Sequence, residues 1–289
     1  AKADEKKDSE VIGEEQFFIK NLDFSYLPDV PVLKALNMRL DKRPTAIIGQ
    51  NGAGKTTLVK LLKGLLKPVS GNIYFRGEDI SGKTVAMLAG NVGYVFQNPF
   101  NQNSGVKSTV YEEISYGLEN LGVPREEIFL RVDRVIELLG IGYLAGKHPL
   151  KLSGGQCQRV ALASVIVMEP EVLLIDEPTS QLDPKGTEDV FKIIQMLKEK
   201  GKTTILVEHK IDRIAEYAGR VLVMDGGQIV MDGSAQEILS DPTLLNYGIN
   251  VPEVSMLGLK LRESGYDLPQ IPITLDQAET LIGTLREGN

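Results

Sequence analysis

The sequence predicts an α/β fold in which a largely parallel sheet is covered by helices on both faces. Three short apolar segments alternate with helical patterns in the second half of the chain, at residues 171–178, 203–209 and 220–233. Strands that consist almost entirely of apolar residues are typical of parallel sheets, because both of their faces are buried. An antiparallel β subdomain, an inserted helical subdomain and a short C-terminal appendage complete the predicted fold.

The first 16 residues are polar, show no periodicity and do not begin with Met, so we expect a disordered leader or a cloning remnant. Order is expected from Phe17 onward. Alternating and β-favouring positions in 17–26 and 32–43, on either side of a proline-containing turn, predict strands of an antiparallel system.

A short apolar segment at 44–49 predicts a buried strand, and a helix is expected from Lys55 to about Leu65 because its leucines fall on one face. Two further strands are predicted at 70–80 and 92–97. The chain therefore enters a strand-to-helix unit directly after its antiparallel part.

Helical patterns with glycine stops dominate residues 98–168, which we interpret as the inserted helical subdomain. Two more helices, at 188–199 and 210–218, separate the apolar strands of the second half. Both predictions agree with a sheet whose strands are joined by helices.

Two short helices are expected near the C-terminus, at 252–263 and 275–286, with a proline-containing loop between them. They are compatible with a cap on the main domain and equally with a dimerisation or regulatory appendage. The expected domains are the leader 1–16, a main domain 17–245 with its helical subdomain at about 98–168, and a helical extension 246–289.

The composition excludes several classes of protein. A formal net charge of −7 argues against a sequence-independent nucleic-acid binder, so we expect no nucleic-acid partner. No run of 18 apolar residues and no apolar signal segment occur, so we expect a cytoplasmic protein or one attached to a membrane through another protein. The single cysteine, Cys157, is expected to be a packing residue, with a reactive thiol at a helix N-terminus as the alternative.

The segment GQNGAGKT, residues 49–56, has the spacing of a P-loop and lies between a buried strand and a helix start. In such a loop the backbone amides surround the phosphates, the lysine reaches the β and γ oxygens, and the hydroxyl can bind Mg²⁺. Lys55 and Thr56 are the residues at those two positions. The motif predicts nucleotide binding.

Polar side chains follow three of the apolar strands. Asp176 and Glu177 come at the end of VLLIDE, where ligands of open α/β sheets bind. Asp176 is placed to hold Mg²⁺, and Glu177 can polarise the attacking water as a general base. His209 and Gln97 end two other apolar strands and are therefore expected at the same edge of the sheet. The histidine can contact the γ-phosphate or orient Glu177, although a strand-end histidine is often incidental, and the glutamine can contact Mg²⁺ and water.

A second helix start with phosphate-binding features lies about a hundred residues after the P-loop. Ser153, Gly154 and Gly155 precede an apolar run at helical spacing, so backbone N–H groups and the positive end of the helix dipole converge there. His148, in the preceding loop, is interpreted as structural. One nucleotide site per domain does not explain two such helix starts.

The set Tyr26, GQNGAGKT, Gln97, LSGGQ, LLIDEP, SQLD and His209, in this order, resembles the nucleotide-binding subunit of ATP-binding cassette (ABC) transporters. The resemblance covers residues 17–239 and implies a P-loop NTPase core. It also implies that two ATPase domains associate head to tail, so that LSGGQ of one subunit closes over the γ-phosphate held by the P-loop of the other. That arrangement would explain the second helix start.

The resemblance implies ATP and Mg²⁺ as cofactors and a role for each matching residue. Tyr26 would stack on adenine, Gln97 would link the Mg²⁺ site to the helical subdomain, and Asp183 would lie at the dimer interface. Gln181 stands where the family more often has Ala, and LVEHK replaces the more usual surroundings of the histidine. The implied catalytic residues are Glu177, His209, Gln97 and Lys55. The implied metal ligands are Thr56, Gln97 and Asp176. The implied nucleotide ligands are Tyr26, Gly49, Asn51, Gly52, Ala53, Gly54, Lys55, Thr56, Thr57, Ser153, Gly154, Gly155, Gln156 and Asp183.

Within the family, FQNPFNQ and the helical segment after it resemble the ATPases of energy-coupling factor (ECF) transporters, which import vitamins and nickel or cobalt ions. Phe100 stands where that group has an acidic residue. The implied partners are a second ATPase subunit, identical or not, and a transmembrane energy-coupling subunit with a substrate-binding membrane protein, on the cytoplasmic face of the membrane. The alternatives are a soluble ABC protein in translation or DNA repair and a non-catalytic ATP-binding regulator.

Overall fold

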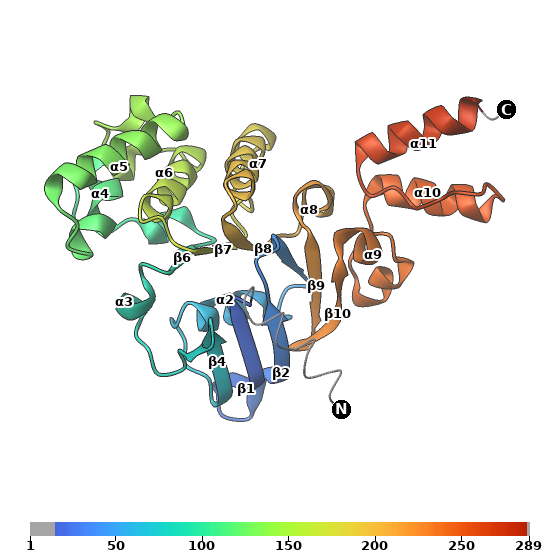
Figure 1. Ribbon diagram of the computed structural model, residues 1–289, viewed down its shortest axis with the longest axis horizontal. Helices are drawn as coiled ribbons and strands as arrows, with labels where there is room; N and C mark the ends of the chain where they lie inside the picture. Colours follow the sequence, from blue (N-terminus) through green and yellow to red (C-terminus); the bar gives the residue numbers. More distant parts are fainter. Residues whose placement is uncertain (1–14, 288–289) are drawn as a thin grey trace.

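Two sheets of different kinds form the centre of the protein, whose computed structural model describes residues 15–287 (Figure 1). The main sheet has six strands in the order β10-β9-β3-β8-β7-β6. Five of them run parallel, and β10 pairs antiparallel with β9 at one edge. Its strands are β3 (Thr45–Ile48), β6 (Val92–Val95), β7 (Val172–Asp176), β8 (Thr203–Val207), β9 (Arg220–Asp225) and β10 (Gln228–Ser234).

The second sheet is antiparallel, with the strand order β2-β1-β4-β5. Its strands are β1 (Phe17–Leu27), β2 (Val30–Leu40), β4 (Ser70–Phe75) and β5 (Glu78–Asp79). One residue of the expected leader is bonded to this sheet: Gln16 is buried, its N–H donates to the carbonyl of Leu40 at 2.7 Å, and its carbonyl accepts from the backbone N–H of Arg76 at 3.0 Å. The ordered chain therefore begins before Phe17, and residues 1–14 lie outside the described part.

Both faces of the main sheet are covered, as the apolar strands predict. In β3, Ala46 and Ile48 pack in one hydrophobic core and Ile47 in the other. Side chains alternate between the faces of a strand, so a buried residue at every position requires a layer on each side. One core lies between the two sheets and includes α2 (Lys55–Leu62), and the other lies beneath the helices of the opposite face.

The helical subdomain lies at the end of the main sheet next to β6 (Figure 1). Its long helices pack on one another through apolar stripes, and the N-terminus of α4 is closed by a capping box between Thr109 and Glu112. The elements of this part are η1 (Pro99–Gln102), α4 (Val110–Asn120), α5 (Arg125–Leu138), η2 (Gly142–Leu144), η3 (Pro149–Lys151) and α6 (Gly154–Ile166).

Two helices differ from their expected bounds by three or four residues at one end. The helix expected at 188–199 is α7 (Pro184–Glu199), which begins four residues earlier because Asp183 caps it, accepting a bond from the Gly186 N–H at 2.7 Å. Proline at the first helical position is compatible with such a start. The helix after the P-loop ends at Leu62 rather than Leu65. The remaining helices of the main domain are α3 (Val85–Leu88), α8 (Ile211–Tyr217) and α9 (Ala235–Leu239).

The loops around the C-terminal helices contribute to the core of the main domain. Ile249, Val251 and Ile273 lie in the same hydrophobic core as the main-sheet residue Ala46. Gln50 of the P-loop also donates to the carbonyl of Tyr247 at 3.0 Å. The elements of this part are η4 (Pro242–Tyr247), α10 (Glu253–Glu263) and α11 (Leu275–Glu287), at the right of Figure 1.

Among residues 15–287, none of the helices combines the length and the apolar character that crossing a bilayer requires.

Candidate active site

The P-loop joins the end of β3 to the first turn of α2. Gly54, the N-cap of α2, has a φ of 99°, which residues with a side chain rarely adopt. A Cβ atom on Gly54 would also lie 2.7 Å from Cδ2 of Leu33. No side chain caps this helix start, and the first N–H groups of a helix have no partner within the helix. These groups are therefore available to an anion.

Lys55 lies inside the loop that it follows. Its Nζ donates to the carbonyls of Gly49 at 2.9 Å and Gln50 at 3.0 Å, and the residue is 4% exposed. Burial lowers the pKa of Lys55, while the charges of Glu177 and Asp176 oppose that shift. The ammonium group is held by carbonyl oxygens, which a phosphate oxygen can replace.

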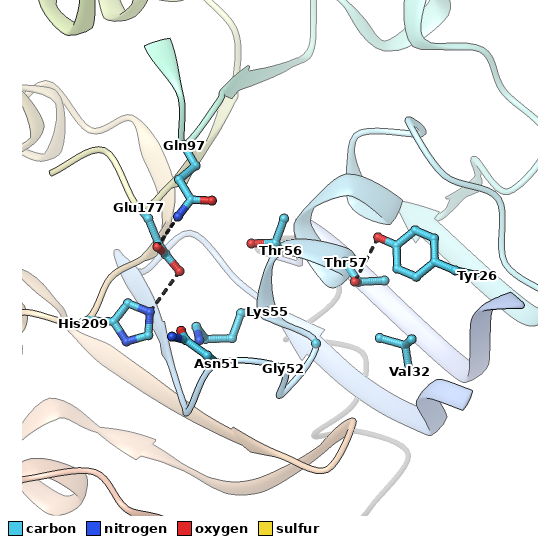
Figure 2. Close-up of a pocket in the computed structure, with 11 residues that line it drawn as sticks. Tyr26, Val32, Asn51, Gly52, Lys55, Thr56, Thr57, Gln97, Glu177 and His209 are labelled. Carbon is cyan, nitrogen blue, oxygen red and sulfur yellow. Dashed lines mark hydrogen bonds and ion pairs between the residues drawn. The ribbon is translucent and has the colours of Figure 1, made fainter. Parts of the chain in front are cut away.

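A cavity of about 630 Å³ opens above the P-loop (Figure 2). It brings together residues from β1, β2, α2 and the ends of three strands of the main sheet. Its walls combine backbone of a helix start with carboxylate, amide, imidazole and aromatic groups. The lining residues are Tyr26, Val32, Asn51, Gly52, Gly54, Lys55, Thr56, Thr57, Gln97, Glu177 and His209.

Glu177 lies at the centre of a three-residue cluster at the sheet edge. The amide of Gln97 donates to its Oε2 at 2.6 Å, and Nε2 of His209 lies 2.9 Å from its Oε1 (Figure 2). These residues follow β6, β7 and β8, which are neighbours in the sheet, so their side chains meet at one edge. Glu177 has a φ of 43°, a left-handed conformation that is uncommon for a residue with a side chain and frequent at functional sites.

Asp176, the last residue of β7, is 1% exposed and contacts the start of α2. Its Oδ1 accepts a hydrogen bond from the Thr56 hydroxyl at 3.0 Å, and its Oδ2 accepts one from the Tyr94 hydroxyl at 2.9 Å. Burial raises the pKa of Asp176, although these two hydrogen bonds act in the opposite direction. The carboxylate lies beside the cavity and reaches it through Thr56.

The donor set fits a magnesium ion. The described residues include no group of three or more His, Cys, Asp or Glu side chains that could hold a metal. Mg²⁺ bound with a nucleotide does not need one, because one or two protein oxygens, phosphate oxygens and water complete its shell. The Thr56 hydroxyl and the Asp176 carboxylate are such oxygens, and Gln97 brings an amide oxygen to the same cavity.

The outer end of the cavity carries an aromatic side chain. Tyr26, at the end of β1, is 56% exposed, and its hydroxyl lies 3.2 Å from Oγ1 of Thr57. Its ring packs edge-to-face on Phe24, with the ring centres 4.9 Å apart. Val32 lines the same end. An exposed aromatic face held at its edge can stack on a planar base.

The second predicted phosphate site is elsewhere on the molecule. Ser153 and Asp183 line a separate cavity of about 400 Å³, and none of its lining residues belongs to the cavity above the P-loop. Ser153 caps α6: its hydroxyl accepts from the Gln156 N–H, and the Gln156 side chain accepts from the Ser153 N–H. The lining residues are Ser153, Gly154, Gly155, Gln156, Arg159, Gln181, Leu182, Asp183, Lys185, Gly186 and Asp189.

Most residues expected at the nucleotide gather in one of these two cavities. Gly49 and Ala53 do not line the first one: Gly49 contributes its carbonyl to Lys55, and Ala53 is buried against the interior. His148 caps η3 by accepting the Leu150 N–H, in keeping with a structural role. Cys157 is fully buried, and burial raises its thiol pKa to about 11, which contradicts the alternative of a reactive thiol.

The sequence did not reveal Tyr94 and Val32. Tyr94 is buried in β6, where its hydroxyl must find a partner, and that partner is Asp176. A tyrosine inside an otherwise aliphatic strand next to the acidic strand was the available signal. Val32 carried no signal, because it is one of several β-branched residues in the antiparallel sheet.

The fold and the two cavities define a P-loop ATPase with a second, separate helix N-terminus suited to phosphate. A profile of the family described as "ABC transporter" matches residues 33–180. The chain belongs to the ABC transporter family, as an ATP-binding subunit, and it is an ATPase whose hydrolysis is coupled to transport.

The similarity to individual proteins extends over nearly the whole chain. The energy-coupling factor transporter ATP-binding protein EcfA2 of Clostridium perfringens is 42% identical over 94% of this chain and 99% of its own. The structure of CbiO1 from Clostridium perfringens, part of the ABC transporter complex CbiONQ, covers 87% of this chain and 98% of its own, with 36% identity and a TM-score of 0.72.

A third comparison concerns the catalytic cycle. The ATP-binding cassette MJ0796, in a dimeric post-hydrolysis state bound to ADP and Pi, covers 76% of this chain and 98% of its own, with 25% identity and a TM-score of 0.67. These comparisons favour a transporter subunit over the soluble ABC protein and over the non-catalytic regulator.

Proposed function

We propose that this chain is the ATP-hydrolysing subunit of an energy-coupling factor importer and that it works as a head-to-tail dimer. Each composite site would consist of the P-loop cavity of one subunit and the Ser153 helix start of the other. The separation of these two parts within one chain carries the proposal, because the P-loop cavity includes no residue of the Ser153 segment. The names of the relatives support the importer type.

In the proposed reaction Glu177 accepts a proton from the attacking water, since its carboxylate is fixed at the cavity by bonds to two other side chains. His209 holds Glu177 and reaches the γ-phosphate. Lys55 exchanges its carbonyl partners for phosphate oxygens, and Tyr26 stacks on the base. The Ser153 hydroxyl and the first N–H groups of α6 contact the γ-phosphate held by the other subunit.

Thr56 and Asp176 are the residues that would hold Mg²⁺, with Gln97 near them. When bound with ATP, the ion neutralises charge on the β- and γ-phosphates. Asp176 accepts the Thr56 hydroxyl at 3.0 Å, and this bond orients the hydroxyl oxygen before any ligand arrives. Tyr94 occupies the other carboxylate oxygen and so fixes the plane of the carboxylate.

Binding of one ATP by two subunits favours the closed dimer, and loss of the γ-phosphate releases it. We propose that this movement drives a transmembrane energy-coupling subunit, to which the chain binds on the cytoplasmic face of the membrane. Vitamins or transition-metal ions would be the imported substrates. The relatives named as ECF subunits and as part of CbiONQ support this assignment.

The composite site can be tested by mixing two inactive variants, Ser153→Arg and Lys55→Ala. Each variant alone lacks both complete sites. A mixed dimer would regain one, so an equimolar mixture should recover about a quarter of wild-type hydrolysis, since half of the dimers carry one intact site of two. Recovery that disappears when the mixture is diluted below the dimerisation range would support the shared site. Full activity of Ser153→Arg alone would exclude it.

The membrane assignment is tested by affinity purification of the chain from detergent-solubilised native membranes, followed by mass spectrometry. A co-purifying polytopic subunit is the expected result, and the same experiment reports whether the second ATPase is this chain or another. Recovery of ribosomal or DNA-repair proteins without a membrane subunit would contradict the importer.

A further inference from the structure

Glu208 is a buried carboxylate that no part of the proposed reaction uses. It follows β8 directly and precedes His209, yet it does not line the cavity above the P-loop. It is 2% exposed. A charged group so deeply buried needs partners for both oxygens, because burial of an unpaired carboxylate is strongly unfavourable.

The partners of Glu208 come from two segments of the chain. Its Oε2 accepts the hydroxyl of Thr179 at 2.7 Å. Its Oε1 accepts the backbone N–H of His209 at 2.9 Å and that of Lys210 at 3.3 Å. All three partners are hydrogen-bond donors, so the carboxylate serves as the acceptor for one hydroxyl and two backbone N–H groups at once.

These contacts tie together the two loops that meet at Glu177. Thr179 lies two residues after Glu177, and it is also fully buried. Lys210 strengthens the connection, because its Nζ donates to Oγ1 of Thr187 at 2.6 Å and contacts the carbonyl of Thr179 at 3.4 Å. The turn that carries His209 is therefore fastened to the loop after Glu177 by side chains on both of its flanks.

We propose that Glu208 is a positioning residue for ATP hydrolysis: it holds the turn of His209 against the loop of Glu177, so that the imidazole keeps its 2.9 Å contact with the carboxylate. This inference rests on the proposed roles of Glu177 and His209. Glu208 contributes no atom to the reacting groups and acts through His209.

The side-chain chemistry separates two substitutions at this position. Glu208→Ala leaves the Thr179 hydroxyl and two N–H groups without their acceptor. Glu208→Gln keeps an oxygen for the two N–H groups and turns its NH₂ group toward the Thr179 hydroxyl, which can accept. The glutamine variant should therefore recover most of what alanine loses. Thr179→Val, which removes one of the three contacts, should lie between them.

The first measurement is the steady-state hydrolysis of ATP by the full chain, with ATP affinity measured separately by fluorescent nucleotide. Glu208→Ala should lower kcat about tenfold to a hundredfold, as expected when a catalytic group is slightly misplaced. Its Kd for ATP should stay within about twofold of wild type, because Glu208 lies outside the P-loop cavity.

The chain offers a matched control in Glu113, which is 4% exposed and accepts the N–H and the hydroxyl of Ser104 in the helical subdomain. Glu113→Ala removes a buried carboxylate that holds a loop, as Glu208→Ala does, but this loop belongs to the helical subdomain and does not carry His209. It should leave kcat unchanged. Thermal unfolding of both variants shows how far each loses stability.

A double-mutant cycle with His209→Ala tests whether Glu208 acts through the histidine. If it does, Glu208→Ala should change kcat by less than about twofold in the His209→Ala background. Full additivity would overturn the proposal, as would equal losses of kcat in the glutamine and alanine variants. A wild-type chain that fails to hydrolyse ATP would instead refute the proposed function, so the two failures are distinguishable.

Discussion

The two helix N-termini that the sequence marks for phosphate differ in what already occupies them. At α2 no side chain caps the helix, and the loop before it borders a cavity that contains the cluster of Gln97, Glu177 and His209. At α6 the hydroxyl of Ser153 and the amide of Gln156 bond to each other's backbone N–H groups, and the surrounding cavity has no carboxylate–histidine pair. The α2 helix start is therefore uncapped and lies beside polar and charged side chains, whereas the α6 helix start is capped by its own side chains.

This difference indicates a division of labour. The α2 site holds the groups that we propose bind a nucleotide and activate water, so we expect it to bind ATP in the isolated subunit. The α6 site has a helix dipole and a hydroxyl, but the residues that line its cavity include no aromatic side chain to stack on a base and no P-loop lysine. In the proposed dimer, the other subunit brings the nucleotide to this site. Substitutions at the two sites should therefore separate binding from hydrolysis.

The largest effect is expected from Glu177→Gln in the α2 site. The amide keeps the shape of the side chain but cannot accept a proton, so hydrolysis should fall about a hundredfold to ten-thousandfold. ATP affinity should be retained and an ATP-bound dimer should accumulate, measured by light scattering after size-exclusion chromatography. Glu188→Gln, on the exposed side of α7, is the control. Hydrolysis near the wild-type rate would show that Glu177 is not the general base.

Ser153→Arg at the α6 site should abolish most hydrolysis, by about a hundredfold or more, because a donor to the developing charge is lost and the helix start is blocked. Binding of ATP to the isolated subunit should be nearly unchanged, by fluorescent-nucleotide titration. A collapse of affinity would mean that the α6 site serves its own chain.

The matched control for that variant is Ser234→Arg. Ser234 forms the same capping box, with Glu237 at α9, so its loss reports the cost of an N-cap alone. It should destabilise the protein by about 1 kcal/mol without a comparable loss of hydrolysis. Similar losses in both variants would attribute the Ser153 effect to folding.

The sequence predicted those parts of the fold and the site that depend on neighbouring residues, and it missed contacts between residues far apart in the chain. The P-loop and the two acids at the end of β7 were predictable because a local motif fixes each of them, and the meeting of Gln97, Glu177 and His209 followed from strands ending at one sheet edge. The predicted start of α7 at Glu188 was wrong, and the helix begins at Pro184, because a proline and a glycine in the first turn weakened the helical pattern. Tyr94 and Glu208 were missed because their partners are 82 and 29 residues away.

Tyr94→Phe tests one of these long-range contacts in the α2 site. Loss of the hydroxyl leaves Oδ2 of Asp176 buried without that donor, which costs about 1 to 3 kcal/mol. We expect weaker Mn²⁺ binding in the presence of ATP, by electron paramagnetic resonance, and about tenfold slower hydrolysis. Tyr111→Phe removes a hydroxyl bond to Asp133 on the surface and is the control. Unchanged Mn²⁺ affinity would show that Asp176 needs no support from Tyr94.

The smallest effect is expected on thermal stability, from Asp176→Asn in the α2 site. Burial raises the pKa of Asp176, so the folded state disfavours its charge relative to the unfolded chain, and ionisation lowers stability as the pH rises above the ordinary value of 3.8. Asp176→Asn should therefore raise Tm at pH 7 by roughly 2 to 4 °C, or on the order of 1 kcal/mol, while it impairs hydrolysis. The gain should shrink on acidification, because the wild-type carboxyl then becomes neutral as well. Asp133→Asn, at an exposed site, should show neither effect. A lower Tm for Asp176→Asn would mean that the two hydrogen bonds of Asp176 stabilise the folded state by more than the burial of its charge destabilises it. The α2 site would then cost the protein no more stability than the α6 site does.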